Sequence, residues 1–151
     1  MQKEIYDLSG VLRKAGVMRK YAGCLSVKGN YRKKNQDRAC CLSSSKKGIL
    51  FAVGCVCDGI GSFAQSEIAA EMIRVGIERW FLGMEPLYPE NIDEESLIDD
   101  LDMTIRELNE LIWIYRKENG IDIGCTMSLL VLLNEKISCI SCWRQQDPAD
   151  R

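Results

Sequence analysis

The sequence predicts one mixed domain of helices and strands, of the α/β (α+β) class. Residues 49–57 form a nearly continuous apolar run, which is typical of a strand with cover on both faces. Two long stretches between residues 62 and 119 repeat apolar residues with the period of a helix. Near the C-terminus, a hairpin-sized turn separates two more apolar runs of strand length.

The composition is ordinary for a soluble globular protein and excludes several classes of function. The chain has 151 residues, enough for one domain with a buried core, and a formal net charge of −2. A charge so close to zero gives no field that recruits nucleic acid or an anionic membrane. No apolar run has the length of a membrane span, and the first residues lack the pattern of a signal peptide. We therefore expect a cytoplasmic protein without nucleic-acid or membrane partners.

Histidine and cysteine restrict the chemistry further. The absence of histidine excludes Ser-His-Asp and Cys-His catalysis as well as histidine-ligated zinc. Most of the eight cysteines lie in apolar, strand-like runs, where cysteine acts as a small hydrophobic residue. We expect them to be reduced thiols, as in cytoplasmic proteins. Acid-base or metal chemistry must then use carboxylates, cysteines, lysines or bound water.

The first third of the chain alternates between polar and apolar segments. Residues 1–20 are polar and only loosely periodic, which indicates an N-terminal lead-in, either a short helix or a frayed segment. The pattern then predicts a strand at 21–28, a basic loop at 29–37 and a second strand at 38–42. A turn at 43–48 and the central strand at 49–57 follow.

Two amphipathic helices are expected next. Ser62 and Gln65 have the spacing of a capping box, so the first helix is predicted to begin there and to stop at Gly83. The second helix is predicted over residues 93–119, with a stop at Asn119-Gly120. After the helices, residues 127–133 and 137–141 read as the two strands of a hairpin. The last residues, 142–151, follow neither period and form an aberrant tail.

Two acidic residues are candidate metal ligands because each lies beside turn residues at the end of a predicted strand. Asp37, Asp58 and the backbone carbonyl of Gly59 offer the oxygen ligands that Mg²⁺ and Mn²⁺ prefer, if their strands are neighbours. Arg32, on the same basic loop as Asp37, is suited to clamp phosphate oxygens with its guanidinium. The alternative is plain turn chemistry on a solvated basic face. Spacing alone leaves both interpretations open.

The cysteines suggest a rival site. Cys55 and Cys57, together with Cys139 and Cys142, match the ligand number of a four-thiolate zinc site. The flanking residues lack the glycine-turned knuckles of zinc ribbons, so this signal is weak.

Three motifs in order resemble the metal-dependent serine/threonine protein phosphatases of type 2C, the PPM family, in their bacterial form. The first is an arginine, a short gap and Asn-(Glu/Gln)-Asp, here Arg32-Lys33-Lys34-Asn35-Gln36-Asp37. The second is an apolar strand that runs into Asp-Gly-x-Gly-Gly, here Asp58-Gly59-Ile60-Gly61-Ser62. The third is Gly-(Cys/Thr)-Thr at the head of a hydrophobic strand, here Gly124-Cys125-Thr126. The match covers roughly residues 21–141.

This resemblance implies the N-terminal part of a four-layer α-β-β-α sandwich with antiparallel sheets and two Mn²⁺ or Mg²⁺ ions. Asp37 and Asp58 would be metal ligands, Asp58 bridging, and Gly59 would offer its carbonyl. Arg32 would bind the substrate phosphate. The implied reaction is hydrolysis of phosphoserine or phosphothreonine by a metal-bridged hydroxide. The implied protein is a monomer that acts on a phosphorylated protein and opposes a Ser/Thr kinase.

The sequence also departs from the family pattern. Gln36 stands where many members have Glu, Ser62 replaces the last glycine of the second motif, and Ile60 stands where some relatives carry a histidine. The family's later aspartates do not occur in residues 142–151 as a matching motif. We therefore expect an incomplete phosphatase domain at residues 21–141 that binds metal poorly and is inactive. The alternative is a non-catalytic, phosphatase-like interaction module.

The tail generates a prediction about the gene. If Cys142 to Asp147 is encoded as TGT TGG AGA CAG CAG GAT, a reading frame one nucleotide later gives Val-Gly-Asp-Ser-Arg-Ile. The family continues with Gly-Asp-Ser-Arg at this point, so we predict a frameshift after Ser141. Sequencing the nucleic acid across these codons tests the prediction, which fails if no shifted frame encodes Gly-Asp-Ser-Arg.

Overall fold

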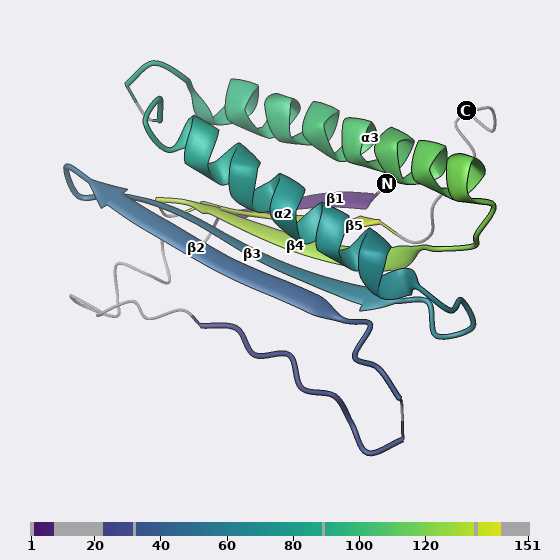
Figure 1. The fold of residues 1–151 in the computed structure, drawn as a ribbon. Helices are drawn as coiled ribbons and strands as arrows, with labels where there is room; N and C mark the ends of the chain where they lie inside the picture. Colours follow the sequence, from purple (N-terminus) through teal and green to yellow (C-terminus); the bar gives the residue numbers. More distant parts are fainter. Residues whose placement is uncertain (1, 8–22, 32, 89, 135, 143–151) are drawn as a thin grey trace.

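In the computed structural model, the part of the chain that can be described folds as a five-stranded antiparallel sheet with two helices on one face (Figure 1). The structure describes residues 2–7, 23–31, 33–88, 90–134 and 136–142. The strand order across the sheet is β1-β5-β4-β3-β2, and each strand pairs antiparallel with its neighbours. The mixed α+β class is therefore confirmed. No helix among these residues is both long enough and apolar enough to span a bilayer.

The strands and helices have the following bounds. The strands are β1 Gln2–Asp7, β2 Arg38–Lys46, β3 Ile49–Gly59, β4 Cys125–Leu133 and β5 Lys136–Cys142. The helices are α2 Ser66–Met84 and α3 Glu94–Asn119. The central strand, the C-terminal hairpin and the second helix thus lie where the sequence predicts them.

The N-terminal segments differ from the prediction. Gln2–Asp7 is a strand that pairs with β5, so a helix or frayed lead-in is wrong for these residues. This pairing covers the backbone groups along one side of β5 that would otherwise lie at the sheet edge. The strand predicted at 21–28 is wrong for residues 23–28, which form no regular structure. Leu25 and Val27 alternate correctly but are 86% and 70% exposed, since no sheet pairs with them. Residues 8–20 and the tail at 143–151 lie outside the described residues.

The predicted turn at 43–48 is too long. Strand β2 continues to Lys46, and only Lys47 and Gly48 form the connection, with φ of 49° and 82°. Two left-handed residues are what a tight two-residue hairpin requires. The polar residues before this turn stay in the strand because Glu85, the residue that follows α2, offers them partners. Ser44 Oγ donates to Glu85 Oε1 at 2.6 Å, and Lys46 Nζ donates to the Glu85 carbonyl at 2.9 Å.

Both helices pack on one face of the sheet and form a single core with it. That face is lined by alternating buried residues of β3 and β4, including Phe51, Val53, Leu129 and Val131. Helix α2 contributes Trp80 and Phe81, whose rings contact the ring of Phe51. Helix α3 completes the core with Leu97, Ile98, Leu101, Ile105 and Ile112. The opposite face carries no described helix or strand, so cover on both faces of the central strand is not observed there.

The helix ends show which local signals were reliable. Helix α3 has the bounds that the sequence predicts. Asp93 Oδ1 accepts from the Ser96 N–H at 2.8 Å and caps its start, and Gly120, with a φ of 61°, ends it. The capping box at Ser62 and Gln65 is wrong. Helix α2 begins only at Ser66, and Gln65 makes no side-chain capping bond. Instead, the Ser66 hydroxyl donates to the Ile60 carbonyl at 3.0 Å and so closes the intervening turn.

Candidate metal site

The loop before β2 crosses the end of β3 at a position where only glycine fits. A Cβ atom added to Gly59 would lie 2.6 Å from both Cβ and the carbonyl oxygen of Gln36. Real side chains do not tolerate such distances to a backbone, so the loop and the strand meet only because residue 59 has no side chain. This close approach brings the residue after Gln36, Asp37, to the end of β3.

Two side chains tie the same loop to the start of α2. The Gln36 amide Nε2 donates to the Phe63 carbonyl at 2.8 Å. The Lys34 ammonium lies 3.0 Å from Glu67 Oε1. Gln36 stood out in the sequence only as a departure from Glu; the structure gives it the role of a tether. No sequence pattern identifies this role, because Phe63 accepts through its backbone.

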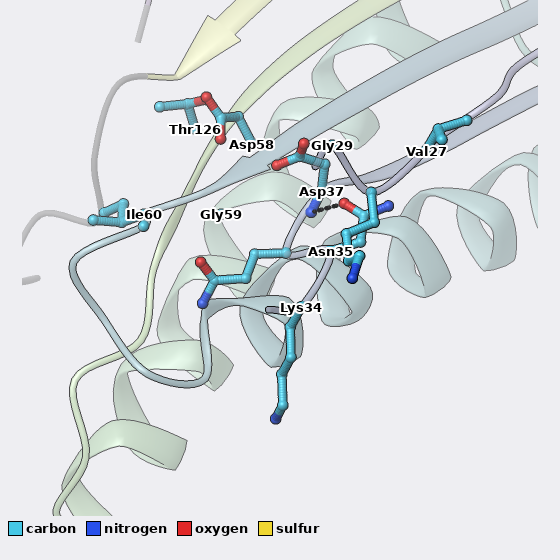
Figure 2. A pocket seen from close by; sticks show the side chains of 12 residues that line it. Val27, Gly29, Lys34, Asn35, Asp37, Asp58, Gly59, Ile60 and Thr126 are labelled. Carbon is cyan, nitrogen blue, oxygen red and sulfur yellow. Dashed lines mark hydrogen bonds between the residues drawn. The ribbon is translucent and has the colours of Figure 1, made fainter. Parts of the chain in front are cut away.

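Asp37 is held by its backbone, which leaves its carboxylate at the surface. Its N–H donates to Asn35 Oδ1 at 3.1 Å, and its carbonyl accepts from Ser26 Oγ at 3.2 Å and from Arg38 Nη1 at 2.9 Å. The Asn35 amide also donates to Ser26 Oγ at 2.8 Å. Figure 2 shows the resulting orientation, in which the Asp37 carboxylate points toward Asp58.

Asp58 lies near the end of β3 on the face of the sheet opposite the helices. Its exposed side chain neighbours Thr126, because the two residues pair in the register of β3 and β4. The alternation of β3 explains this position: Cys57 and Gly59 are buried toward the helices, so the residue between them points the other way.

Asp37, Asp58 and Gly59 line one cavity of about 320 Å³. The sequence predicted that these three residues would converge if their strands were neighbours, and the structure brings them together. The other lining residues come from all three sequence motifs and from the segment before them: Val27, Lys28, Gly29, Lys34, Asn35, Gln36, Ile60, Gly61 and Thr126. Arg32, the predicted phosphate ligand, lies outside the described residues.

The chemistry of this cavity suits a hard cation. Mg²⁺ is usually held by one or two carboxylates together with several waters, and two carboxylates with one carbonyl match that need. The described residues hold no group of three or more histidine, cysteine or acidic side chains arranged to bind a metal. The two carboxylates and one carbonyl of the described cavity wall would leave the other coordination positions of a hard cation to water.

The zinc hypothesis is wrong because the register separates the thiols. Cys55 pairs with Leu129, and Leu129 pairs with Ile140, so these three residues lie on the same face of the sheet. Cys139, the neighbour of Ile140 along β5, therefore points to the opposite face. Cys55 Sγ lies 3.7 Å from Cys57 Sγ, and both are buried under α2. A hydrogen bond with Cys40, followed by burial, raises the pKa of the Cys55 thiol to about 12. Without a metal, a thiol with this pKa is protonated at neutral pH.

Five cysteines outside this pair are also free. Cys24, Cys40, Cys41, Cys125 and Cys139 form no disulfide, in agreement with the expectation of reduced thiols. Of these five, Cys40 and Cys125 are buried and belong to the core, whereas Cys24 is exposed and Cys41 and Cys139 are only partly buried.

No family model, no curated protein and no solved structure matches this chain.

The contact at Gly59 generates a prediction with a control on the same strand. Gly59→Ala should displace the loop at residues 33–37 and lower the free energy of unfolding by about 1–3 kcal/mol, as overpacking does. Gly54→Ala should leave that free energy unchanged or raise it by up to about 1 kcal/mol, because nothing lies within 4 Å of a Cβ at Gly54. Urea unfolding measures both. If both substitutions changed the free energy of unfolding equally, the close approach of Gln36 to Gly59 would be refuted.

Proposed function

We propose that this chain carries the metal-binding half of a protein serine/threonine phosphatase site of the PPM type. The observation that carries the proposal is the convergence of Asp37, Asp58 and Gly59 on one cavity. All three motifs of the resemblance contribute to its wall, through Asn35-Gln36-Asp37, Asp58-Gly59 and Thr126. The register of β2, β3 and β4 brings these residues to one end of the sheet, and their oxygen-bearing side chains make that end a candidate cation site.

The residues of the cavity have complementary tasks in the proposed reaction. Asp37, Asp58 and the Gly59 carbonyl would hold Mn²⁺ or Mg²⁺. Bound there, the metal supplies a hydroxide at neutral pH and a positive charge for the phosphoryl oxygens. Lys28 and Lys34 bring cationic groups to the same wall, although Lys34 is paired with Glu67. Arg32 is the proposed phosphate clamp. No covalent phosphoenzyme is required, which suits a chain without histidine.

The uncovered face of the sheet supports the finer proposal of a four-layer α-β-β-α sandwich. Among the described residues of β2 to β5, the register places only one charged side chain on this face, that of Asp58. Val56 and Leu130 are 56% and 42% exposed there. A cavity of about 560 Å³ runs along the face beside Gly54 and Cys139. A partly apolar face with few charges in β2 to β5 is typical of the inner side of two packed sheets.

The proposed setting is that of the family. The substrate is a phosphorylated protein, the opposing activity is that of a Ser/Thr kinase, and the compartment is the cytoplasm. We propose a monomer whose domain at residues 21–141 is incomplete and whose phosphatase activity on its own is low.

A second proposal is a non-catalytic interaction module that keeps the fold. One observation favours it: the cavity wall contains only two carboxylates among the described residues. A pair of ions at one site ordinarily requires more negative charge than two carboxylates provide.

Phosphopeptide hydrolysis with Mn²⁺ distinguishes the two proposals. We expect little activity from this chain and clear activity from a version with the reading frame restored after Ser141. Asp58→Asn should then lower that activity by at least about a hundredfold, since even groups behind metal ligands account for about 10–100-fold.

The control is Glu90→Gln, which removes an exposed carboxylate paired with Lys47 at the β2–β3 turn, at the opposite end of β3 from Asp58, and should leave the rate unchanged. Absence of activity from both versions would favour the interaction module. Activity that survives Asp58→Asn would exclude the proposed site.

A further inference from the structure

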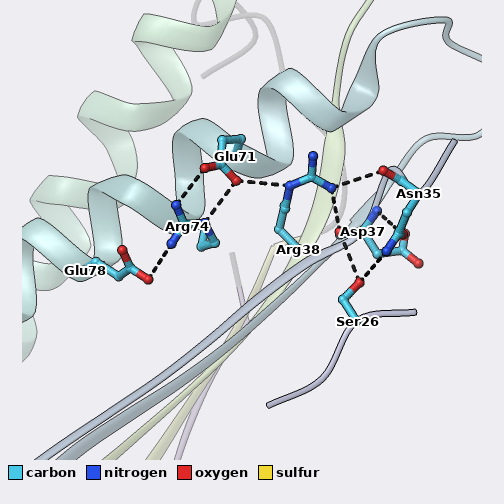
Figure 3. A network of polar contacts seen from close by, with 7 residues as sticks. All are labelled: Ser26, Asn35, Asp37, Arg38, Glu71, Arg74 and Glu78. Carbon is cyan, nitrogen blue, oxygen red and sulfur yellow. Dashed lines mark hydrogen bonds and ion pairs between the residues drawn. The ribbon is translucent and has the colours of Figure 1, made fainter. Parts of the chain in front are cut away.

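Arg38 joins the loop of the candidate site to helix α2. It is the first residue of β2 and follows Asp37 directly. Its Nε donates to Glu71 Oε2 at 3.0 Å, and its Nη1 donates to the carbonyls of Asn35 at 3.1 Å and Asp37 at 2.9 Å (Figure 3). One guanidinium therefore bonds a helix carboxylate and the two carbonyls on either side of Gln36.

The helix fixes the carboxylate that Arg38 uses. Arg74 donates to both oxygens of Glu71, through Nη2 at 2.6 Å and Nε at 3.0 Å, and also pairs with Glu78. Arg74 first, and Arg38 after it, hold the pKa of Glu71 below its ordinary value, so Glu71 is ionised at neutral pH. Figure 3 shows the continuous row of contacts from Glu78 to Asp37.

The geometry of Arg38 differs from that of an ordinary surface ion pair. A partly exposed pair of this kind contributes little to stability by itself. Here the same side chain also satisfies two backbone acceptors of a loop without regular structure. The planar fork of arginine reaches all three acceptors at once, whereas a lysine ammonium on its flexible stem does not hold them in one plane.

We propose that Arg38, anchored by Glu71, is a positioning residue that holds the Asp37 carboxylate toward Asp58 and thereby sets the metal affinity of the cavity. Gln36 lies between the two clamped carbonyls and against Gly59, so the clamp also presses the loop onto the strand. The proposal rests on the proposed function, because it assumes that Asp37 and Asp58 bind one metal site. The role is new for α2, which contributes no residue to the cavity wall among the described residues.

The effect acts through the loop conformation. Without the guanidinium, the segment at residues 35–37 samples arrangements in which Asp37 faces away from Asp58. The apparent affinity falls by the fraction of molecules that keep the binding arrangement. Groups behind metal ligands typically account for about 10–100-fold in affinity, and for this partly exposed clamp we expect about tenfold.

The experiment measures Mn²⁺ binding to the full chain by the electron paramagnetic resonance signal of free Mn²⁺. Arg38→Ala and Glu71→Gln should each weaken binding by about tenfold. The double variant should be no weaker than the weaker single variant, because both substitutions break the same clamp. Arg38→Lys keeps the charge and should fall between the wild type and Arg38→Ala. Circular dichroism confirms that each variant is folded.

The matched control is Arg106→Ala, which removes an arginine that pairs with Asp102 on α3 at 2.8 Å and lies away from the cavity. It should leave Mn²⁺ affinity unchanged. The proposal that Arg38 positions Asp37 fails if a folded Arg38→Ala binds Mn²⁺ as tightly as the wild type. It also fails if the losses in the double variant are additive, or if Arg106→Ala loses as much affinity as Arg38→Ala.

Hydrogen exchange at the Asp37 amide, which donates to Asn35, separates this proposal from the proposed function. If the wild type binds no Mn²⁺, the metal site itself is wrong. Faster exchange in Arg38→Ala and Glu71→Gln, but not in Arg106→Ala, would then still support the positioning of Asp37. Equal exchange in all variants would refute it.

Discussion

The candidate site depends on the contact between the backbone of Gln36 and the bare Cα of Gly59. At 2.6 Å from the position that a Cβ would take, this contact leaves no room for any other residue on the strand. It places the end of a loop against the end of a buried strand, and Asp37 and Asp58 then face the same cavity. The glycine has therefore a steric task here, in addition to the carbonyl that it offers to a metal.

The two faces of the sheet differ in what they carry. The helix side holds the core, the aromatic contacts of Phe51 and the ion pairs that reach from α2 to the loop. On the other side, the register of β2 to β5 places one charged residue, Asp58, near the end of β3. If a second sheet covered this face, as we propose, water would screen the attraction between Asp58 and a bound cation less than it does at an open surface. The one-sided core thus puts the candidate ligand on the side that the proposed second sheet would cover.

The sequence predicted those parts of the fold that depend on local signals. Asp93 and Gly120 bound helix α3 because a cap and a left-handed glycine act within one turn of the chain. Asp37, Asp58 and Gly59 were predicted as a site from their residue types and order, and they do line one cavity. Partners distant in sequence could not be foreseen: Glu85 keeps Ser44 in a strand, and Phe63 fixes Gln36. Alternation at Leu25 and Val27 predicted a strand wrongly, because a strand also requires a neighbour with which to pair.

The central claim is that Asp37 and Asp58 bind one divalent cation, and paramagnetic broadening by Mn²⁺ in nuclear magnetic resonance spectra tests it most directly. The account predicts that substoichiometric Mn²⁺ first broadens the amide signals of Asp37, Asp58 and Gly59, with Thr126 close behind. Excess Mg²⁺ should reverse the effect, because both ions prefer oxygen ligands. Broadening centred on the acidic first turn of α3, at Glu94 and Glu95, would contradict the account, as would no localised broadening at all.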